Sequence, residues 1–74
     1  MNKVREIREH LKLSQDEVAK KVGISRNWLY QIEIGKANPT YKVMQKLSEV
    51  YDVPASEIFF NQPGNNKFQN KKMS

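Results

Sequence analysis

Apolar residues in the first 60 positions of this 74-residue chain recur at spacings of three and four, the period of an amphipathic helix. They fall into five short runs separated by polar, glycine or proline positions. The runs predict helices over residues of about 2–11, 15–21, 26–33, 41–51 and 55–60. Five short helices with tight connections predict an all-α fold of low contact order.

The breaks between the runs carry residues that cap helices. Ser14 stands three residues before Glu17, the spacing of a capping box, in which the hydroxyl and the carboxylate each satisfy a free backbone N–H. Ser25 and Thr40 are placed to cap the third and fourth helices. Gly23 stands where a left-handed residue would end the second helix, because glycine adopts positive φ without a Cβ clash.

The second and third predicted helices are joined by so short a turn that they must cross at a steep angle. Ala19 lies mid-way along the second helix and is small enough for close approach at the crossing. A common apolar seam is then formed by Val18, Ile24, Leu29 and Ile32. This is the helix-turn-helix pattern, which presents the outer face of its second helix to a DNA major groove.

Net charge adds little to this argument. The chain carries +5, but Lys67, Lys71 and Lys72 supply three of those charges in a stretch without acids. Residues 1–60 hold 10 basic and 8 acidic residues, a net charge of +2. Overall charge is therefore weak evidence for nucleic-acid binding, and the placement of individual side chains has to carry the argument.

Composition excludes several classes of site. The chain has no cysteine, so neither disulfides nor a cysteine-based zinc site stabilise it, which suits a reducing cytoplasm. It shows neither a signal peptide nor an apolar run of membrane-spanning length, so we expect a soluble cytoplasmic protein. His10 is the only histidine, and no nucleophile is placed beside a base. We therefore expect no metal, no cofactor and no enzymatic activity.

Length limits the chain to one small domain, predicted over residues 1–60, because a second core could not be built from the remainder. Residues 61–74, NQPGNNKFQNKKMS, are polar and basic and predict a flexible tail. Phe60 has the least reason to be buried among the apolar residues of the last run. It suggests a dimer contact, which Phe68 would join if the tail folds back.

The stretch LSQDEVAKKVGISRNWLYQIEIGKANPT resembles the helix-turn-helix domain of the lambda-type phage repressors and their bacterial relatives, the Xre family. Residues in the family's register are Gln15, Glu17, Ala19, Gly23, Leu29, Ile32, Glu33, Gly35 and Pro39. The later VYDVPASEIF resembles the fifth-helix segment of the same family. The resemblance implies sequence-specific binding of double-stranded DNA by a dimer, usually to repress transcription.

The resemblance also implies roles for individual residues. The positions that match base-reading residues are Arg26, Asn27 and Gln31. Their chemistry agrees, since Arg forks onto the O6 and N7 of guanine, and Asn or Gln onto the N6 and N7 of adenine. Ordinary surface exposure is the alternative for all three.

Other matched positions imply contacts with the DNA backbone or within the fold. Backbone contacts are implied for Gln15, Lys36, Asn38, and the start of the fourth helix around Thr40 and Tyr41. Gln15 would also brace the reading helix. Glu33 matches a position that pairs with an arginine of the first helix, for which Arg8 is aligned; this pair would be structural.

The two aromatic residues of the reading helix have two interpretations each. Trp28 either packs against the loop after Gly35 or stacks on a sugar-phosphate. Tyr30 lies on the opposite flank and is too exposed for the core, so it contacts DNA or nothing. Together these features predict a homodimeric repressor on a pseudo-palindromic operator, in a prokaryote or a phage. The alternative is a small protein that acts mainly through a protein partner, as an antitoxin or anti-repressor.

Overall fold

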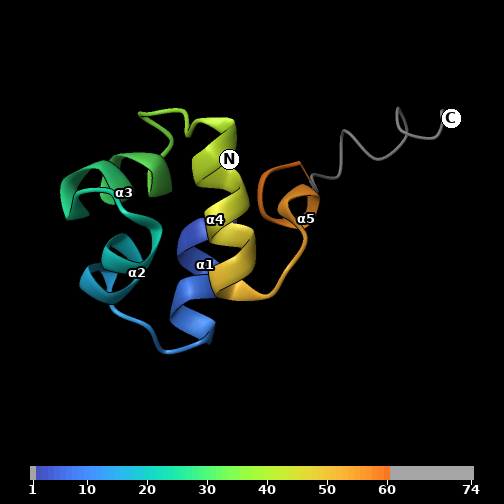
Figure 1. The fold of residues 1–74 in the computed structure, drawn as a ribbon, viewed down its shortest axis with the longest axis horizontal. Helices are drawn as coiled ribbons and strands as arrows, with labels where there is room; N and C mark the ends of the chain where they lie inside the picture. Colours follow the sequence, from blue (N-terminus) through green and yellow to red (C-terminus); the bar gives the residue numbers. More distant parts are fainter. Residues whose placement is uncertain (1, 61–74) are drawn as a thin grey trace, which may run out of the picture.

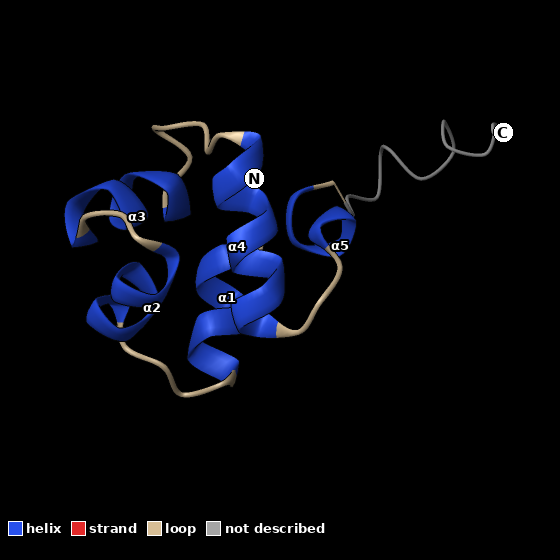
Figure 2. Ribbon diagram, viewed as in Figure 1, coloured by secondary structure: helices blue, strands red, loops and turns tan. Residues whose placement is uncertain are grey.

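The computed structural model describes residues 2–60, which form five α-helices joined by loops (Figure 1). They are α1 (Val4–His10), α2 (Gln15–Val22), α3 (Arg26–Glu33), α4 (Tyr41–Tyr51) and α5 (Ala55–Phe59). Figure 2 shows helices and loops alone over this range. The predicted all-α, five-helix fold is confirmed. The predicted tail, residues 61–74, and its Phe68 lie outside the described residues.

The first helix is shorter at both ends than the pattern predicted. Asn2 is not helical, because its side chain accepts a hydrogen bond from the Val4 N–H at 2.9 Å and donates one to the Ile32 carbonyl at 2.8 Å. Beyond His10 the chain turns through Lys12, whose φ is +61°. The expected bounds of α2 and α5 differ from the observed ones by a single residue, at Val22 and Phe59.

Hydrogen-bonding side chains define the starts of the three middle helices. Ser14 Oγ accepts from the Glu17 N–H at 3.0 Å, and the Ser14 N–H donates to the Glu17 carboxylate at 2.8 Å, which completes the capping box. Ser25 caps α3 by accepting from the Trp28 N–H, and Thr40 caps α4 by accepting from the Val43 N–H.

Left-handed residues end α2 and α4. Gly23, with φ +88°, follows α2, and its N–H donates to the Ala19 carbonyl at 2.8 Å. Asp52, with φ +58°, ends α4 in the same way; the pattern predicted the end of this helix at residue 51 but not the left-handed conformation. Asp tolerates this conformation better than most non-glycine residues, because its short side chain makes local hydrogen bonds.

A single core joins all five helices. Its buried apolar residues are Val4, Val18, Ala19, Val22, Leu29, Ile32, Val43, Leu47, Tyr51 and Ile58. α2 packs on α3 and α4, whereas α1 contacts α3, α4 and α5. In Figure 1, α2 and α3 lie on one side of the α1–α4 pair and α5 lies on the other. Burying each Leu or Ile of this core contributes about 1.5–3 kcal/mol to folding.

Besides the hydrogen bond from Asn2 to Ile32, two long-range hydrogen bonds attach the N-terminal segment to this core. The buried Tyr51 hydroxyl donates to the Val4 carbonyl at 3.1 Å, and the Lys3 N–H donates to the Ile58 carbonyl at 2.8 Å. Burial raises the pKa of Tyr51 above its ordinary range, so the hydroxyl keeps its proton and remains a donor. The start of α1 is therefore held to α4 and α5.

Candidate nucleic-acid interface

α2 and α3 are joined by the three-residue turn Gly23–Ser25. The N–H groups of Gly23 and Ile24 both donate to the Ala19 carbonyl, at 2.8 and 3.0 Å, which tightens the turn. Ala19 itself is buried, on a helix that packs against both α3 and α4, so a larger side chain would have to displace its neighbours. This arrangement leaves the start of α3 on the surface.

The outer face of α3 carries hydrogen-bond donors and no exposed acid. Arg26 and Asn27 are exposed, Gln31 is half-buried, and Tyr30 retains 44% of its accessible surface. Leu29, Ile32 and the only carboxylate of the helix, Glu33, are buried on the opposite face. A surface of this kind suits approach to the negatively charged edges of a DNA groove.

Four of the sequence-predicted residues are brought together where the N-terminal ends of α2 and α3 meet. A shallow surface hollow there is lined by Gln15, Arg26, Asn27 and Tyr30. Gln31 is not part of this hollow and lies one turn further along α3. The hollow thus combines two predicted base contacts with two predicted backbone contacts.

A buried carboxylate fixes the position of α3. The Glu33 side chain is 1% exposed and accepts from Arg8 Nε at 2.7 Å and from Gln15 Nε2 at 3.1 Å. Arg8 also donates from NH1 to the Leu13 carbonyl at 2.9 Å. Its hydrogen bond to Glu33 raises the pKa of the Arg8 guanidinium, so the guanidinium keeps its charge. The network connects α1, the start of α2 and the end of α3.

Gln15 therefore braces α3 from the N-terminus of α2. Its Nε2 carries two hydrogens, and one bond to Glu33 leaves the second free to donate to a phosphate. The two roles implied for this position are compatible in one side chain.

The loop after α3 holds the remaining predicted backbone contacts. Gly35 has φ +81°, and the N–H groups of Lys36 and Ala37 both donate to the Gln31 carbonyl, at 2.9 and 3.2 Å. Lys36 and Asn38 are exposed. The backbone is thus tied to α3 while both side chains point to solvent.

At the start of α4, the hydroxyl groups of Thr40 and Tyr41 differ in whether they remain available to bind DNA. The Thr40 hydroxyl already accepts from the Val43 N–H at 3.2 Å, so its side chain is engaged in capping. Tyr41 is 70% exposed, and its hydroxyl accepts from Gln45 Nε2 at 2.9 Å. A phenol that accepts still has its own proton to donate to a phosphate.

Comparison with known protein families shows which family this chain belongs to. A family model described as Helix-turn-helix matches residues 4–58, which is most of the chain. The chain belongs to this helix-turn-helix family. The predicted resemblance to the lambda-type repressors and the Xre family is thereby confirmed. The family is one of DNA-binding transcriptional regulators, not of enzymes, and residues 4–58 carry its DNA-binding domain.

Several individual relatives are similar over the same region. An uncharacterised helix-turn-helix transcriptional regulator of Archaeoglobus fulgidus is 33% identical over 57 residues, which cover 77% of this chain and 80% of the relative. Another, of Methanocaldococcus jannaschii, is 36% identical over 58 residues, which cover 78% of this chain and 88% of the relative. The cryptic phage CTXphi transcriptional repressor RstR of Vibrio cholerae is 33% identical over 57 residues, 77% of this chain and 51% of the repressor.

Within this helix-turn-helix, Trp28 is half-buried and packs against the core. Both predictions for Trp28, packing against the loop after Gly35 and stacking on a sugar-phosphate, stay predictions beside this core contact. Tyr30, on the other flank of α3, is among the most exposed apolar residues of the described chain.

One contact at the helix-turn-helix was missed by the sequence reasoning. Asp16, the second residue of α2, forms an ion pair with Arg26, the first residue of α3, at 3.8 Å between Oδ2 and NH1. The sequence offered two opposite charges, each in the first turn of its helix. Only the docking of α2 on α3 brings them together.

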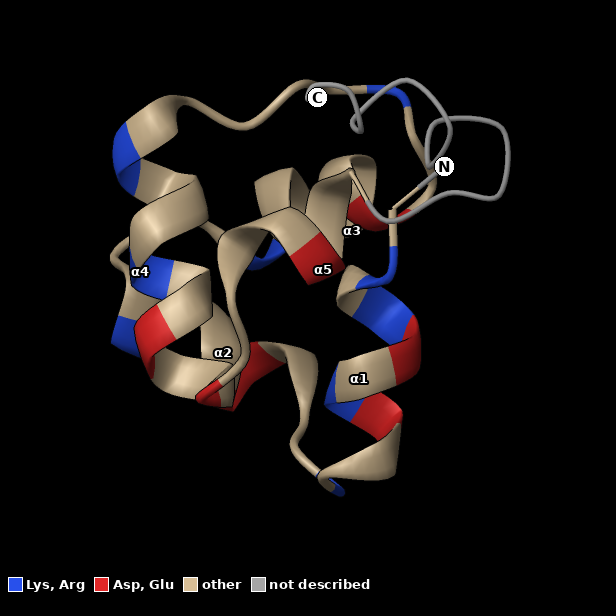
Figure 3. Cartoon of the chain, turned by 90° about the vertical axis from the view of Figure 1, so that its right-hand side faces the viewer, with Lys and Arg blue, Asp and Glu red and all other residues tan. Residues whose placement is uncertain are grey.

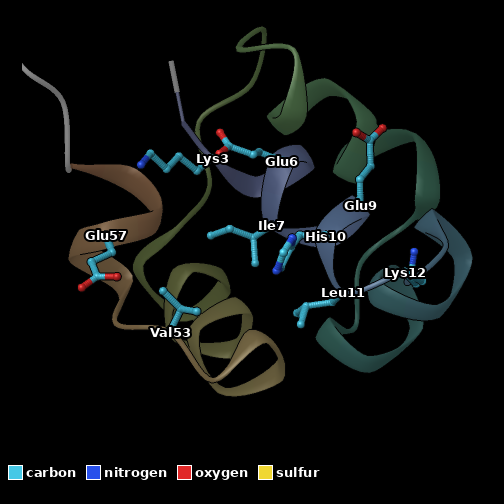
Figure 4. A pocket seen from close by; sticks show the side chains of 9 residues that line it. All are labelled: Lys3, Glu6, Ile7, Glu9, His10, Leu11, Lys12, Val53 and Glu57. Carbon is cyan, nitrogen blue, oxygen red and sulfur yellow. The ribbon is translucent and has the colours of Figure 1, made fainter.

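A separate hollow lies between α1 and the α4–α5 connection, away from the predicted DNA contacts (Figure 4). Ile7, Leu11 and Val53 supply its apolar lining, and His10 lies beside them. Within residues 2–60, no group of three or more His, Cys, Asp and Glu side chains is placed to hold a metal ion.

Figure 3 shows basic and acidic positions interspersed along α1, whose exposed Arg and acidic residues are Arg5, Glu6 and Glu9. This helix therefore presents no uniformly basic face to a nucleic acid. In the described part of the chain, no helix has the length and apolar character needed to cross a membrane.

Proposed function

We propose that this protein is a sequence-specific repressor that binds a pseudo-palindromic DNA operator as a homodimer, through the major groove. The observation that carries the proposal is the donor-rich, acid-free outer face of α3, braced from behind by the buried Glu33 network. Rigid presentation matters because hydrogen bonds to base edges discriminate only when the donors are held in register.

In this proposal different side chains of α3 recognise different bases. Arg26 forks onto guanine O6 and N7, while Asn27 and Gln31 each bind adenine through a donor and an acceptor, and each good pair contributes about 1–3 kcal/mol of discrimination. Asn27 and Gln31 are four residues apart and so share a helix face.

Residues around α3 would bind the sugar-phosphate backbone and set the register. These proposed contacts are Gln15, Trp28, Tyr30, Lys36, Asn38, Thr40 and Tyr41. They lie at the start of α2, within α3, in the loop that follows it and at the start of α4, so they would hold α3 to the backbone from both of its neighbouring helices.

The proposed dimer contact is Phe60, which is 55% exposed directly after α5. Its ring lies 6.3 Å from that of the half-buried Phe59, and both line a hollow with Ala37, Pro39 and Met44. This hollow also includes Asn38 of the loop after α3. A partner bound there would therefore be coupled to the position of the reading helix.

A dimer also explains how a protein with one short reading helix could recognise a long enough DNA sequence. One reading helix contacts only a few base pairs, whereas two related by a twofold axis read two half-sites about 34 Å apart. The similarity to a phage repressor supports repression as the outcome. We propose that the protein acts in the cytoplasm, where the DNA of a prokaryote is found.

Selection of bound duplexes from a random DNA pool tests the proposal most directly. We expect an enriched inverted repeat whose half-sites are centred about one helical turn apart. Fluorescence anisotropy with the selected duplex, against random-sequence competitor, should show a preference that Gln31→Ala reduces. Enrichment of no motif would refute sequence-specific binding. Enrichment of a single half-site bound by one protomer would refute the homodimer alone.

A further inference from the structure

The Asp16–Arg26 pair places a carboxylate on the surface that the proposed function turns toward DNA. Both side chains are largely exposed, 75% for Asp16 and 65% for Arg26, and the 3.8 Å separation is longer than a hydrogen bond. The guanidinium is therefore held by charge and not saturated, since its five N–H donors remain available.

Arg26 stands between two surface hollows. One is lined by Gln15, Asn27 and Tyr30, the residues predicted to contact DNA. The other is lined by Asp16, Glu17, Ala19, Lys20 and Ile24. The arginine thus has the reading surface on one side and an acid on the other.

We infer that Asp16 is a specificity-determining residue, which weakens the binding of Arg26 to phosphates while leaving it free to recognise a guanine edge. The inference rests on the proposed function, because it concerns how the same surface distinguishes one DNA sequence from another. Asp16 itself needs no contact with a base.

The physical argument is that phosphates and guanine attract an arginine differently. A phosphate carries a full negative charge, so a nearby carboxylate repels it and neutralises the cation that would bind it. Guanine O6 and N7 are uncharged acceptors that are recognised by the forked geometry of the guanidinium. Asp16 therefore costs more binding energy on random DNA than on a site with guanine at the right position.

The competing explanation is that Asp16 only stabilises α2, since an acid in the first turn of a helix favours the helix dipole. Glu6 provides a matched control. It is an exposed acid in the first turn of α1, and it lines the hollow of Figure 4 instead of the predicted DNA surface. Asp16→Asn and Glu6→Gln each remove one negative charge from the first turn of a helix.

The experiment measures dissociation constants of the full chain for two duplexes of equal length, the selected site and a random sequence, at several salt concentrations. For Asp16→Asn we expect the random duplex to bind roughly two- to fivefold more tightly, the range that weak interactions between exposed charges allow. The salt dependence should steepen, and the selected duplex should gain less, so the specificity ratio falls. Glu6→Gln should leave that ratio unchanged.

A second part of the experiment repeats these measurements in a protein that lacks the Arg26 side chain. In an Arg26→Ala background, Asp16→Asn should no longer alter the preference for guanine at the base pair that Arg26 reads. Equal tightening on both duplexes, or none on random DNA, would overturn the inference, and thermal unfolding shows whether each variant is folded. A wild type that prefers no DNA site would refute the proposed function instead. The affinities of wild type and Asp16→Asn for random DNA would then still test whether Asp16 weakens binding to phosphates.

Discussion

Arg8 and Glu33, 25 residues apart in the chain, are joined by a hydrogen bond of 2.7 Å between the Nε and Oε2 atoms, almost out of reach of solvent. Gln15 adds a hydrogen bond to the same carboxylate from α2. One buried acid thus organises three helices, and the orientation of α3 depends on it.

Removal of the cation from this network should be costly. For Arg8→Ala we expect the free energy of unfolding to fall by about 3–5 kcal/mol, because Glu33 would remain buried without its partner. Urea denaturation followed by circular dichroism gives the value. The control is Arg5→Ala, which breaks an exposed pair with Glu9 and should cost no more than about 0.5 kcal/mol. Similar losses in the two variants would contradict the assignment.

The capping box of α2 should make stability depend on pH. The Ser14 N–H binds the Glu17 carboxylate and lowers its pKa below the ordinary 4.5. The unfolded chain therefore binds this proton more readily than the folded one, so stability rises with pH through this range. Glu17 contributes its full stabilisation above about pH 4.5 and loses it as the pH falls through the lower folded value.

Thermal unfolding of wild type and Glu17→Gln between pH 7 and pH 3 tests this dependence. The wild type should be the more stable protein at pH 7, and the difference between the two midpoints should close as the carboxylate is protonated. Glutamine keeps the length of the side chain and can still accept a hydrogen bond, so the comparison isolates the charge. A constant difference across the range would show that the charge plays no part.

Local signals made much of this fold predictable. A capping box involves residues three apart, and a helix face involves residues three or four apart. The capping roles of Ser14, Ser25 and Thr40 could therefore be predicted without knowing the tertiary structure. The same holds for Gly23, whose backbone conformation few other residues adopt.

Other features depend on how the helices dock and were not predictable from local patterns. The side chains of Asp16 and Arg26 meet only because α2 packs on α3, and the Tyr51 hydroxyl reaches Val4 only because α4 packs on α1. Lys12 is a turn residue with positive φ and carries no compositional signal for it. The Arg8–Glu33 pairing was implied by family resemblance and not by spacing.

Base-reading and backbone-binding residues should separate by their dependence on DNA sequence. Gln31→Ala should weaken binding to the selected site by about 1–3 kcal/mol and leave random DNA nearly unaffected. Lys36→Ala should weaken both duplexes alike and reduce the salt slope by about one. Anisotropy titrations at several salt concentrations distinguish the two. A loss confined to the selected site in Lys36→Ala would move that residue into the reading set.

If Phe60 forms the dimer contact, its substitution should weaken self-association and leave the reading helix intact. Burying a phenylalanine contributes about 1.5–3 kcal/mol, so Phe60→Ser should raise the dimer dissociation constant at least about tenfold. Sedimentation velocity measures it, and binding to a half-site should survive because α3 is unchanged. Leu11→Ser is the control, since Leu11 is also exposed, at 42%, but lines the hollow of Figure 4. Phe68→Ser tests the contribution predicted for the tail. If Phe60→Ser dimerises like the wild type, the interface lies elsewhere.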